Sequence, residues 1–226
     1  MEQVQKTVFS SSQEALKLTE KIHETLKNPN NTLFEMSSYY FDGQGKGVRP
    51  AVTLSVARAC NNHLKVKLTK HGWQDILIQF FFKVDSEELD YLQKQIAIIC
   101  EMFHTSSLLH DDVIDHAETR RGKTSVNCKW TQASSIQAGV FILSISTKLL
   151  AQTNNPEVIS SMSQILTDLV NGEFQQMASK ADKNDRFQLY LDKTFNKTAS
   201  LMANSCKSVA LLANMNTNDP HIVVSN

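Results

Sequence analysis

Apolar residues recur along this chain every three or four positions rather than every second position. That spacing places them on one face of an α-helix, so the pattern predicts helices and not strands. The predicted helices cover approximately residues 13–27, 34–41, 51–60, 87–115, 133–151, 157–180 and 186–214, with a polar loop at 120–129. Only seven glycines and four prolines occur among the 226 residues, so few helix breakers interrupt the pattern. The predicted fold class is therefore all-α.

One segment departs from this pattern. Residues 65–85 mix basic side chains with three consecutive phenylalanines and match neither neighbouring helix. We interpret 1–226 as one domain, with 65–85 as an atypical insertion. No apolar run reaches the length of about 18 residues that spans a bilayer, so no transmembrane segment is expected.

Composition narrows the possible functions. Twenty-three basic residues balance 23 acidic ones, which argues against a general nucleic-acid-binding surface. The four cysteines are far apart and lack the C-x-x-C spacing of zinc sites, so they are expected to be reduced thiols. Because the net charge is zero, a site that binds a charged ligand must be built from a local cluster of charged residues.

An acidic cluster ends the predicted helix at 87–115. Asp111 and Asp115 lie one helical turn apart on the same face, and Asp112 lies on the flank. Paired carboxylates suit Mg²⁺, which retains waters and takes further oxygens from a substrate phosphate. His104, two turns earlier on the same face, is placed to hydrogen-bond an anion there. A solvated acidic helix end is the alternative interpretation of such a short motif.

Basic side chains in neighbouring motifs favour a metal site over a solvated helix end. Arg120 and Arg121 follow the aspartates, and Lys46 and Arg49 occupy a glycine-rich segment before them. Arginine binds phosphate oxygens through two parallel hydrogen bonds, and lysine binds them as a point charge. Carboxylates for a hard metal ion together with these cations indicate a diphosphate site.

These motifs resemble those of the trans-prenyltransferases, the all-α isoprenyl diphosphate synthases, and most of all the long-chain polyprenyl synthases that make the ubiquinone side chain. The resemblance covers most of the chain from about residue 33. It rests on five segments in family order: Gly45–Pro50, His104–Asp115, Arg120–Gly122, Gly172–Gln176 and Lys197–Leu201. It implies an isoprenoid synthase-type helical bundle that condenses isopentenyl diphosphate head to tail onto an allylic diphosphate of the farnesyl or geranylgeranyl class.

The resemblance also implies roles for individual residues. Asp111, Asp112 and Asp115 would bind Mg²⁺ bridging to the allylic diphosphate, and Arg120, Lys197 and Thr198 would contact that same diphosphate. A second pocket, for isopentenyl diphosphate, would consist of Lys46, Arg49, His104 and Arg121. Catalysis would then depend on Asp111, Asp112, Asp115, Arg120 and Lys197, which stabilise the charge of the departing diphosphate. Glu173 and Gln176 bind either ligand or other helices.

Product length depends on residues before the aspartates. Ser106 and Ser107 are small, which favours a long product because an aromatic side chain there would block the growing tail. Phe103, one turn deeper, either shortens the tail or packs in the core, and we favour the core.

The sequence departs from the family in one respect. The family has a second aspartate-rich motif, but this sequence has no second Asp-Asp pair, and the acidic residues nearest to that description are Asp182 and Asp185. We therefore expect the C-terminal helices of the bundle to be missing and this polypeptide to be weakly active or inactive by itself.

Alternatives from other classes stay open. The chain is either a synthase subunit or an inactive partner that dimerises with a full-length synthase and regulates it. A terpene cyclase is less consistent with a pocket containing Lys46, Arg49 and His104. The resemblance implies a homo- or hetero-oligomer and a mitochondrial location, although no import presequence is visible and the cytoplasm is the alternative.

Overall fold

A computed structural model describes residues 17–43, 45, 47–70, 86–178 and 186–214, and within them the chain is almost entirely helical. A first helix covers 17–26. The others are α2 (Asn31–Ser38), α3 (Val48–Lys70), α5 (Ser86–Ile114), α6 (Val126–Lys129), α7 (Gln132–Ala151), α8 (Pro156–Ala178), α9 (Arg186–Thr194) and α10 (Ser200–Leu212). A π-helix, η1 (Phe195–Ala199), separates α9 from α10, and two short strands, β1 (Thr119–Arg120) and β2 (Lys123–Thr124), form a hairpin. The all-α prediction is confirmed.

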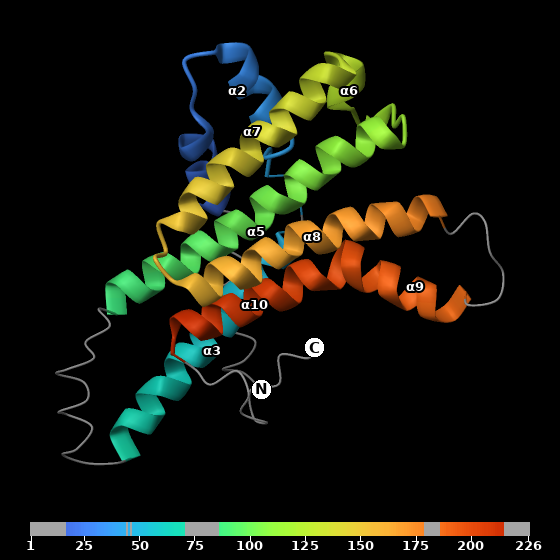
Figure 1. The fold of residues 1–226 in the computed structure, drawn as a ribbon. Coiled ribbons are helices and arrows are strands. Elements are labelled where there is room, and N and C mark those ends of the chain that lie inside the picture. Colours follow the sequence, from blue (N-terminus) through green and yellow to red (C-terminus); the bar gives the residue numbers. More distant parts are fainter. Residues whose placement is uncertain (1–16, 44, 46, 71–85, 179–185, 215–226) are drawn as a thin grey trace.

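Helix α5 is the central element of the bundle (Figure 1). One side packs against α7 and the N-terminal helices, and the other side packs against α3, α8 and α10. The first core cluster takes Ile98, Met102 and Leu109 from α5, and the second takes Ile96, Ile99 and Phe103. These positions are three, four or seven apart within each set, as two faces of one helix require. Each fully buried side chain contributes about 1.5–3 kcal/mol to folding.

Small residues bring α5 and α7 unusually close. Ser106 on α5 donates a 2.9 Å hydrogen bond to the carbonyl of Gly139, and Ser135 on α7 donates one of 3.1 Å to the carbonyl of Leu109. A Cβ at Gly139 would lie only 2.3 Å from His110 Nε2. This contact fixes how α5, with its acidic end, sits against α7.

The hairpin after α5 returns the chain toward the acidic cluster. Thr119 pairs with Thr124 and Arg120 with Lys123, so Arg121 and Gly122 form a two-residue turn. Both turn residues have positive φ, 52° and 77°, as a type I′ turn requires. This turn presents Arg120 and Arg121 close to the end of α5.

Three local predictions need correction. Helix α3 continues to Lys70, past its predicted end at 60, and so includes residues 65–70 of the predicted insertion. The segment predicted as a loop at 120–129 contains the hairpin and α6. The predicted helix at 186–214 contains a π-helical turn. Residues 71–85 of the predicted insertion lie outside the described part of the chain.

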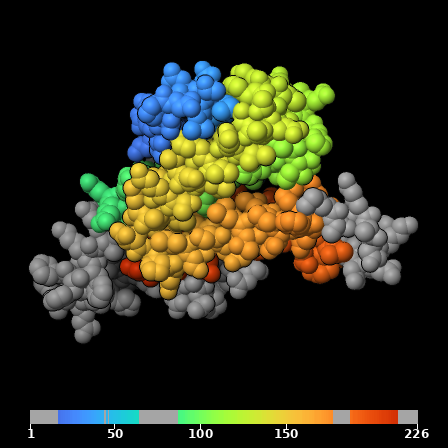
Figure 2. Space-filling model, turned by 45° about the horizontal axis from the view of Figure 1, so that its top comes forward, coloured from blue at the N-terminus to red at the C-terminus, as the bar shows by residue number. Residues whose placement is uncertain are grey.

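Helix α7 is long and apolar enough to cross a membrane, by length and composition alone. In this fold it packs along α5, with Ala138 and Ile142 fully buried in the first core cluster. Figure 2 shows it between α2 and α6 at one end of the molecule and α8 at the other. Only 33% of its apolar stretch is buried in the described part of the bundle, and Ile136 and Val140 are exposed.

Candidate active site

The acidic cluster occupies the C-terminal end of α5. Asp115 follows the last helical residue, but its backbone N–H still donates a 2.8 Å hydrogen bond to the carbonyl of Asp111. The two side chains therefore project from consecutive turns of one face. Asp111 is largely buried and Asp115 is exposed.

Asp112 points away from this pair and is fully buried. Its Oδ2 accepts a 2.7 Å hydrogen bond from the Tyr40 hydroxyl, and its Oδ1 accepts two from Arg120, from Nε at 2.8 Å and from Nη2. The Tyr40 hydroxyl also accepts a 3.2 Å hydrogen bond from the backbone N–H of Val126. Metal binding by Asp112 stays a prediction, and in this arrangement it would displace one of these partners.

Lys197 reaches the acidic cluster from the other side of the bundle. Its Nζ lies 2.6 Å from Glu173 Oε1 and 3.6 Å from Asp111 Oδ2, and it donates a 3.2 Å hydrogen bond to Gln176 Oε1. The ammonium therefore bridges a carboxylate of α5 and a carboxylate of α8. This is the kind of position from which a lysine can meet an anion held at Asp111.

The charges at this junction shift one another's pKa values. Burial and the negative charge of Glu173 raise the pKa of Asp111 to about 6, against a weaker opposing effect of Lys197. Burial alone would lower the pKa of Lys197, but the hydrogen bond to Glu173 and the charges of Asp111, Glu173 and Asp115 raise it overall. The carboxylates of Asp111, Asp115 and Glu173 outnumber the one ammonium of Lys197, so this site favours the binding of a further cation.

Mg²⁺ binding depends on how many oxygen donors this end of α5 offers. Among the described residues, no three His, Cys, Asp or Glu side chains come together in a group that could hold a metal ion. Mg²⁺ commonly takes only one or two carboxylates and completes its shell with waters and phosphate oxygens. The crowded carboxylates of Asp111 and Asp115 fit that requirement, with the remaining ligands supplied by water and substrate.

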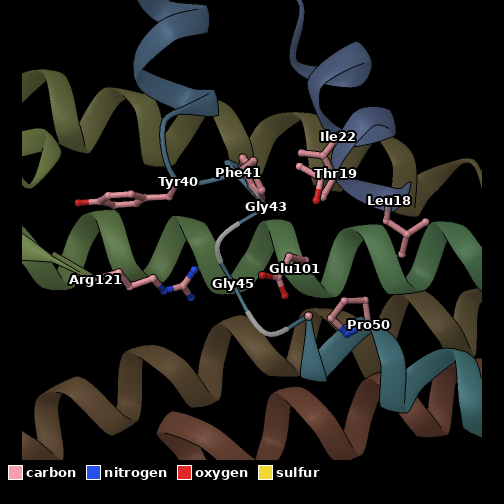
Figure 3. Close-up of a pocket in the computed structure, with 11 residues that line it drawn as sticks. Leu18, Thr19, Ile22, Tyr40, Phe41, Gly43, Gly45, Pro50, Glu101 and Arg121 are labelled. Carbon is pink, nitrogen blue, oxygen red and sulfur yellow. The ribbon is translucent and has the colours of Figure 1, made fainter. Parts of the chain in front are cut away.

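A second charged group surrounds the glycine-rich segment before α3. Arg121 and Glu101 line a hollow on either side of Gly45 (Figure 3), and a Cβ at Gly45 would lie 3.0 Å from Arg121 Nη1. Arg49 lies close enough to influence Glu101 electrostatically, and its buried Nε has no hydrogen-bond partner within the described residues. The unpartnered Nε of Arg49 and the exposed guanidinium of Arg121 suit a second anion.

His104 belongs to this second group rather than to the acidic pair. Burial and, to a lesser extent, the positive charges of Arg49, Arg121 and Arg120 together lower the pKa of His104 to about 3. The imidazole is therefore neutral at physiological pH. A neutral His104 acts on an anion only as a hydrogen-bond donor.

The structure thus sorts the predicted site residues into sets. Asp111, Asp115 and Lys197 come together, and Asp112 pairs with Arg120. Arg49 and Arg121 lie within electrostatic range of His104, and Arg121 also lies beside Gly45. Thr198 is exposed beside Lys197 in η1, and Lys46 lies outside the described residues, as do Asp182 and Asp185. Tyr40 and Glu101 were not identified as site residues from the sequence, because neither belongs to a motif of charged residues with regular spacing.

The structure also gives the positions of the residues predicted to influence product length. Phe103 is 1% exposed within the second core cluster, which confirms its interpretation as a core residue. Ser106 is fully buried at the α5–α7 contact, and Ser107 is half-buried with its hydroxyl bonded to the carbonyl of His104 at 2.8 Å. Their effect on product length stays a prediction.

The bundle is that of known isoprenoid synthases. A decaprenyl diphosphate synthase from Rhodobacter capsulatus superposes with a TM-score of 0.71 at 23% identity over 92% of this chain and 57% of its own. A polyprenyl synthase from Caulobacter crescentus, solved with calcium and isoprenyl diphosphate, gives 0.74 at 23% identity over 95% and 57%. At this identity the comparison establishes the fold alone.

Sequence comparison is more specific. The polyprenyl synthetase family model matches residues 30–224, and the chain belongs to that family. It is 46% identical to the human all trans-polyprenyl-diphosphate synthase PDSS1 over 195 residues, which are 86% of this chain and 42% of that protein. It is 36% identical to decaprenyl-diphosphate synthase subunit 1 of Schizosaccharomyces pombe over 197 residues, 84% and 52% of the two chains. The chain thus spans about half the length of these relatives.

Proposed function

We propose that this chain is a subunit of a long-chain trans-polyprenyl diphosphate synthase, a Mg²⁺-dependent prenyltransferase acting for ubiquinone side-chain synthesis. The observation that carries the proposal is the contact of the Lys197 ammonium with the carboxylates of Asp111 and Glu173, which brings a cation and two carboxylates to one point. The long-chain synthases among the matched relatives support the substrate class. A relative from rice is named as a mitochondrial solanesyl-diphosphate synthase, and the proposed location is accordingly mitochondrial.

The proposed allylic diphosphate lies at the acidic junction. Lys197 would neutralise its oxygens from one side, and Arg120, already oriented by Asp112, would do so from another. Asp111 and Asp115 would hold Mg²⁺, which when bound stabilises negative charge on the leaving diphosphate. Fixed cations aimed at developing negative charge are commonly the largest catalytic contribution.

The proposed isopentenyl diphosphate lies at the second group. Arg49 and Arg121 would bind its oxygens through donors that the folded chain leaves unused or exposed, and neutral His104 would donate one hydrogen bond. Lys46 would add a further charge by family resemblance. The described residues assigned to the two pockets include no serine or cysteine, which agrees with a reaction through a carbocation.

The experiment is an elongation assay. Purified protein would be incubated with farnesyl diphosphate, labelled isopentenyl diphosphate and Mg²⁺, and the products extracted and sized. Labelled products longer than farnesyl diphosphate support a synthase. The absence of product both alone and with a full-length partner subunit, together with absence of Mg²⁺-dependent pyrophosphate binding, would contradict the proposal.

A second candidate is a partner that binds a full-length synthase without turnover. It is favoured by large apolar side chains exposed on α8, α9 and η1: Val170, Phe174, Phe187, Tyr190 and Phe195. Extensive exposed apolar area commonly marks a protein contact. Co-purification with a full-length subunit without elongation by this chain would support this candidate.

A further inference from the structure

Lys197 belongs to a five-residue π-helical turn, η1, between α9 and α10. The residues that flank the turn, Thr194 and Ser200, both have α-helical φ and ψ angles, so α9, η1 and α10 form one continuous helical run. Figure 1 shows this run bending at the junction. A π turn holds one more residue than the regular turn it replaces, and such turns occur frequently at functional sites.

Helix α8 contacts the backbone of this turn at a glycine. A Cβ placed on Gly172 would lie 3.1 Å from the backbone nitrogen of Lys197 and 3.3 Å from Cβ of Asn196. Both distances are shorter than ordinary van der Waals contacts between such atoms. Any side chain at position 172 would therefore push η1 away from α8.

Hydrogen bonds fix the turn on both sides of this contact. Asn196 Nδ2 donates a 3.1 Å hydrogen bond to Gln175 Oε1, and the fully buried Ser200 hydroxyl donates to Asp168 Oδ2. Asp168 is itself nearly buried and accepts a 2.8 Å hydrogen bond from Gln164. The π turn is thus held along α8 both before and after Lys197.

The extra residue determines where the lysine points. Each residue of a helix advances the side-chain direction by about 100°, so one inserted residue rotates everything before it relative to everything after it. Leu201 and Val209 of α10 are buried in the second core cluster, whereas Lys197 points out of that core toward Asp111 and Glu173. The extra residue of the π turn allows Lys197 to point toward the acidic cluster while α10 keeps its apolar face in the core.

We propose that Gly172 and the π turn seated on it are the positioning device for Lys197, and that Gly172 is a positioning residue for the diphosphate contact. This inference rests on the proposed function, because it assumes that Lys197 binds a diphosphate. It goes beyond that function because it makes the position of the Lys197 ammonium depend on the close contact between Gly172 of α8 and the backbone of η1.

A double-mutant cycle tests the inference. Binding of pyrophosphate in the presence of Mg²⁺ is measured by calorimetry for the wild type, Gly172→Ala, Lys197→Ala and the double variant. We expect Gly172→Ala to weaken binding about tenfold, since a displacement well below 1 Å is enough to impair a positioned charge. In the Lys197→Ala background the same change should have no further effect, because Gly172 acts only through the lysine.

The controls separate this role from a structural one. Asn171→Ala changes an exposed residue on the same helix and should leave binding unchanged. Circular dichroism and thermal unfolding of every variant show whether the bundle is intact. Additive losses in the two backgrounds, or wild-type affinity in Gly172→Ala, would overturn the positioning role alone. A wild-type protein that binds no pyrophosphate would overturn the proposed function and this inference with it.

Discussion

The Tyr40 hydroxyl donates a 2.7 Å hydrogen bond to Asp112 Oδ2, although the two residues are 72 positions apart in the sequence. This contact joins the segment after α2 to the end of α5. It also leaves Asp112 with protein partners on both of its oxygens, since Arg120 occupies the other. The middle residue of the acidic cluster is therefore held by Tyr40 and Arg120, while Asp111 lies 3.6 Å from the ammonium of Lys197.

Removing the Tyr40 hydroxyl should destabilise the fold. Tyr40→Phe leaves a buried carboxylate oxygen with one partner fewer, and we expect a loss of about 1–2 kcal/mol in the free energy of unfolding. Urea denaturation measures the change. Tyr39→Phe is the matched control, because the Tyr39 hydroxyl makes no hydrogen bond within the described part of the chain. Equal stability of the two variants would contradict the role assigned to Tyr40.

The neighbouring aspartates should respond differently to the same change. Asp112→Asn removes the charge paired with Arg120 in a fully buried position, and we expect it to cost about 3 kcal/mol of folding stability. Asp111→Asn should instead leave the fold intact and abolish Mg²⁺-dependent pyrophosphate binding. Thermal unfolding and calorimetry on both variants measure the two effects. If Asp111→Asn binds as the wild type does, Asp111 is not part of the metal site.

His104 should make stability depend on pH. Its folded pKa of about 3 lies below the ordinary value of 6.5, so the unfolded chain takes up a proton first as the pH falls. The folded state therefore loses stability between pH 6.5 and 3, and the loss contributed by His104 should reach about 2 kcal/mol at pH 5. His104→Gln cannot take up this proton, so its unfolding free energy should fall less between pH 7.5 and 5. Parallel pH profiles would show that His104 is not kept neutral by the fold.

The α5–α7 contact predicts a steric effect with a specific rescue. A Cβ at Gly139 meets the ring of His110, so Gly139→Ala should destabilise the bundle by about 1–3 kcal/mol. Adding His110→Ala removes the obstructing ring and should restore most of that loss. Chemical denaturation of the single and double variants measures it. A double variant no more stable than Gly139→Ala would mean that the clash involves the helix backbone and not His110.

The sequence was sufficient for the parts of this fold that depend on regular spacing. The two apolar faces of α5 and the shared face of Asp111 and Asp115 follow directly from helical periodicity. Tyr40 could not be found in this way, because a contact over 72 residues leaves no local pattern. The π turn was missed for a different reason. Its five residues, Phe195–Ala199, are all compatible with an ordinary helix, and the extra residue is stabilised by α8.

The pairing of Arg120 with Asp112 has a consequence for how such sites can be transferred. The acidic pair, its supporting aspartate and the arginine all lie within residues 111–124, closed by a two-residue hairpin turn. A donor segment of this length would bring its own internal anchor into another helical scaffold. The host would need to provide a hydroxyl where Tyr40 stands, a buried position for Asp112 and an opposing ammonium.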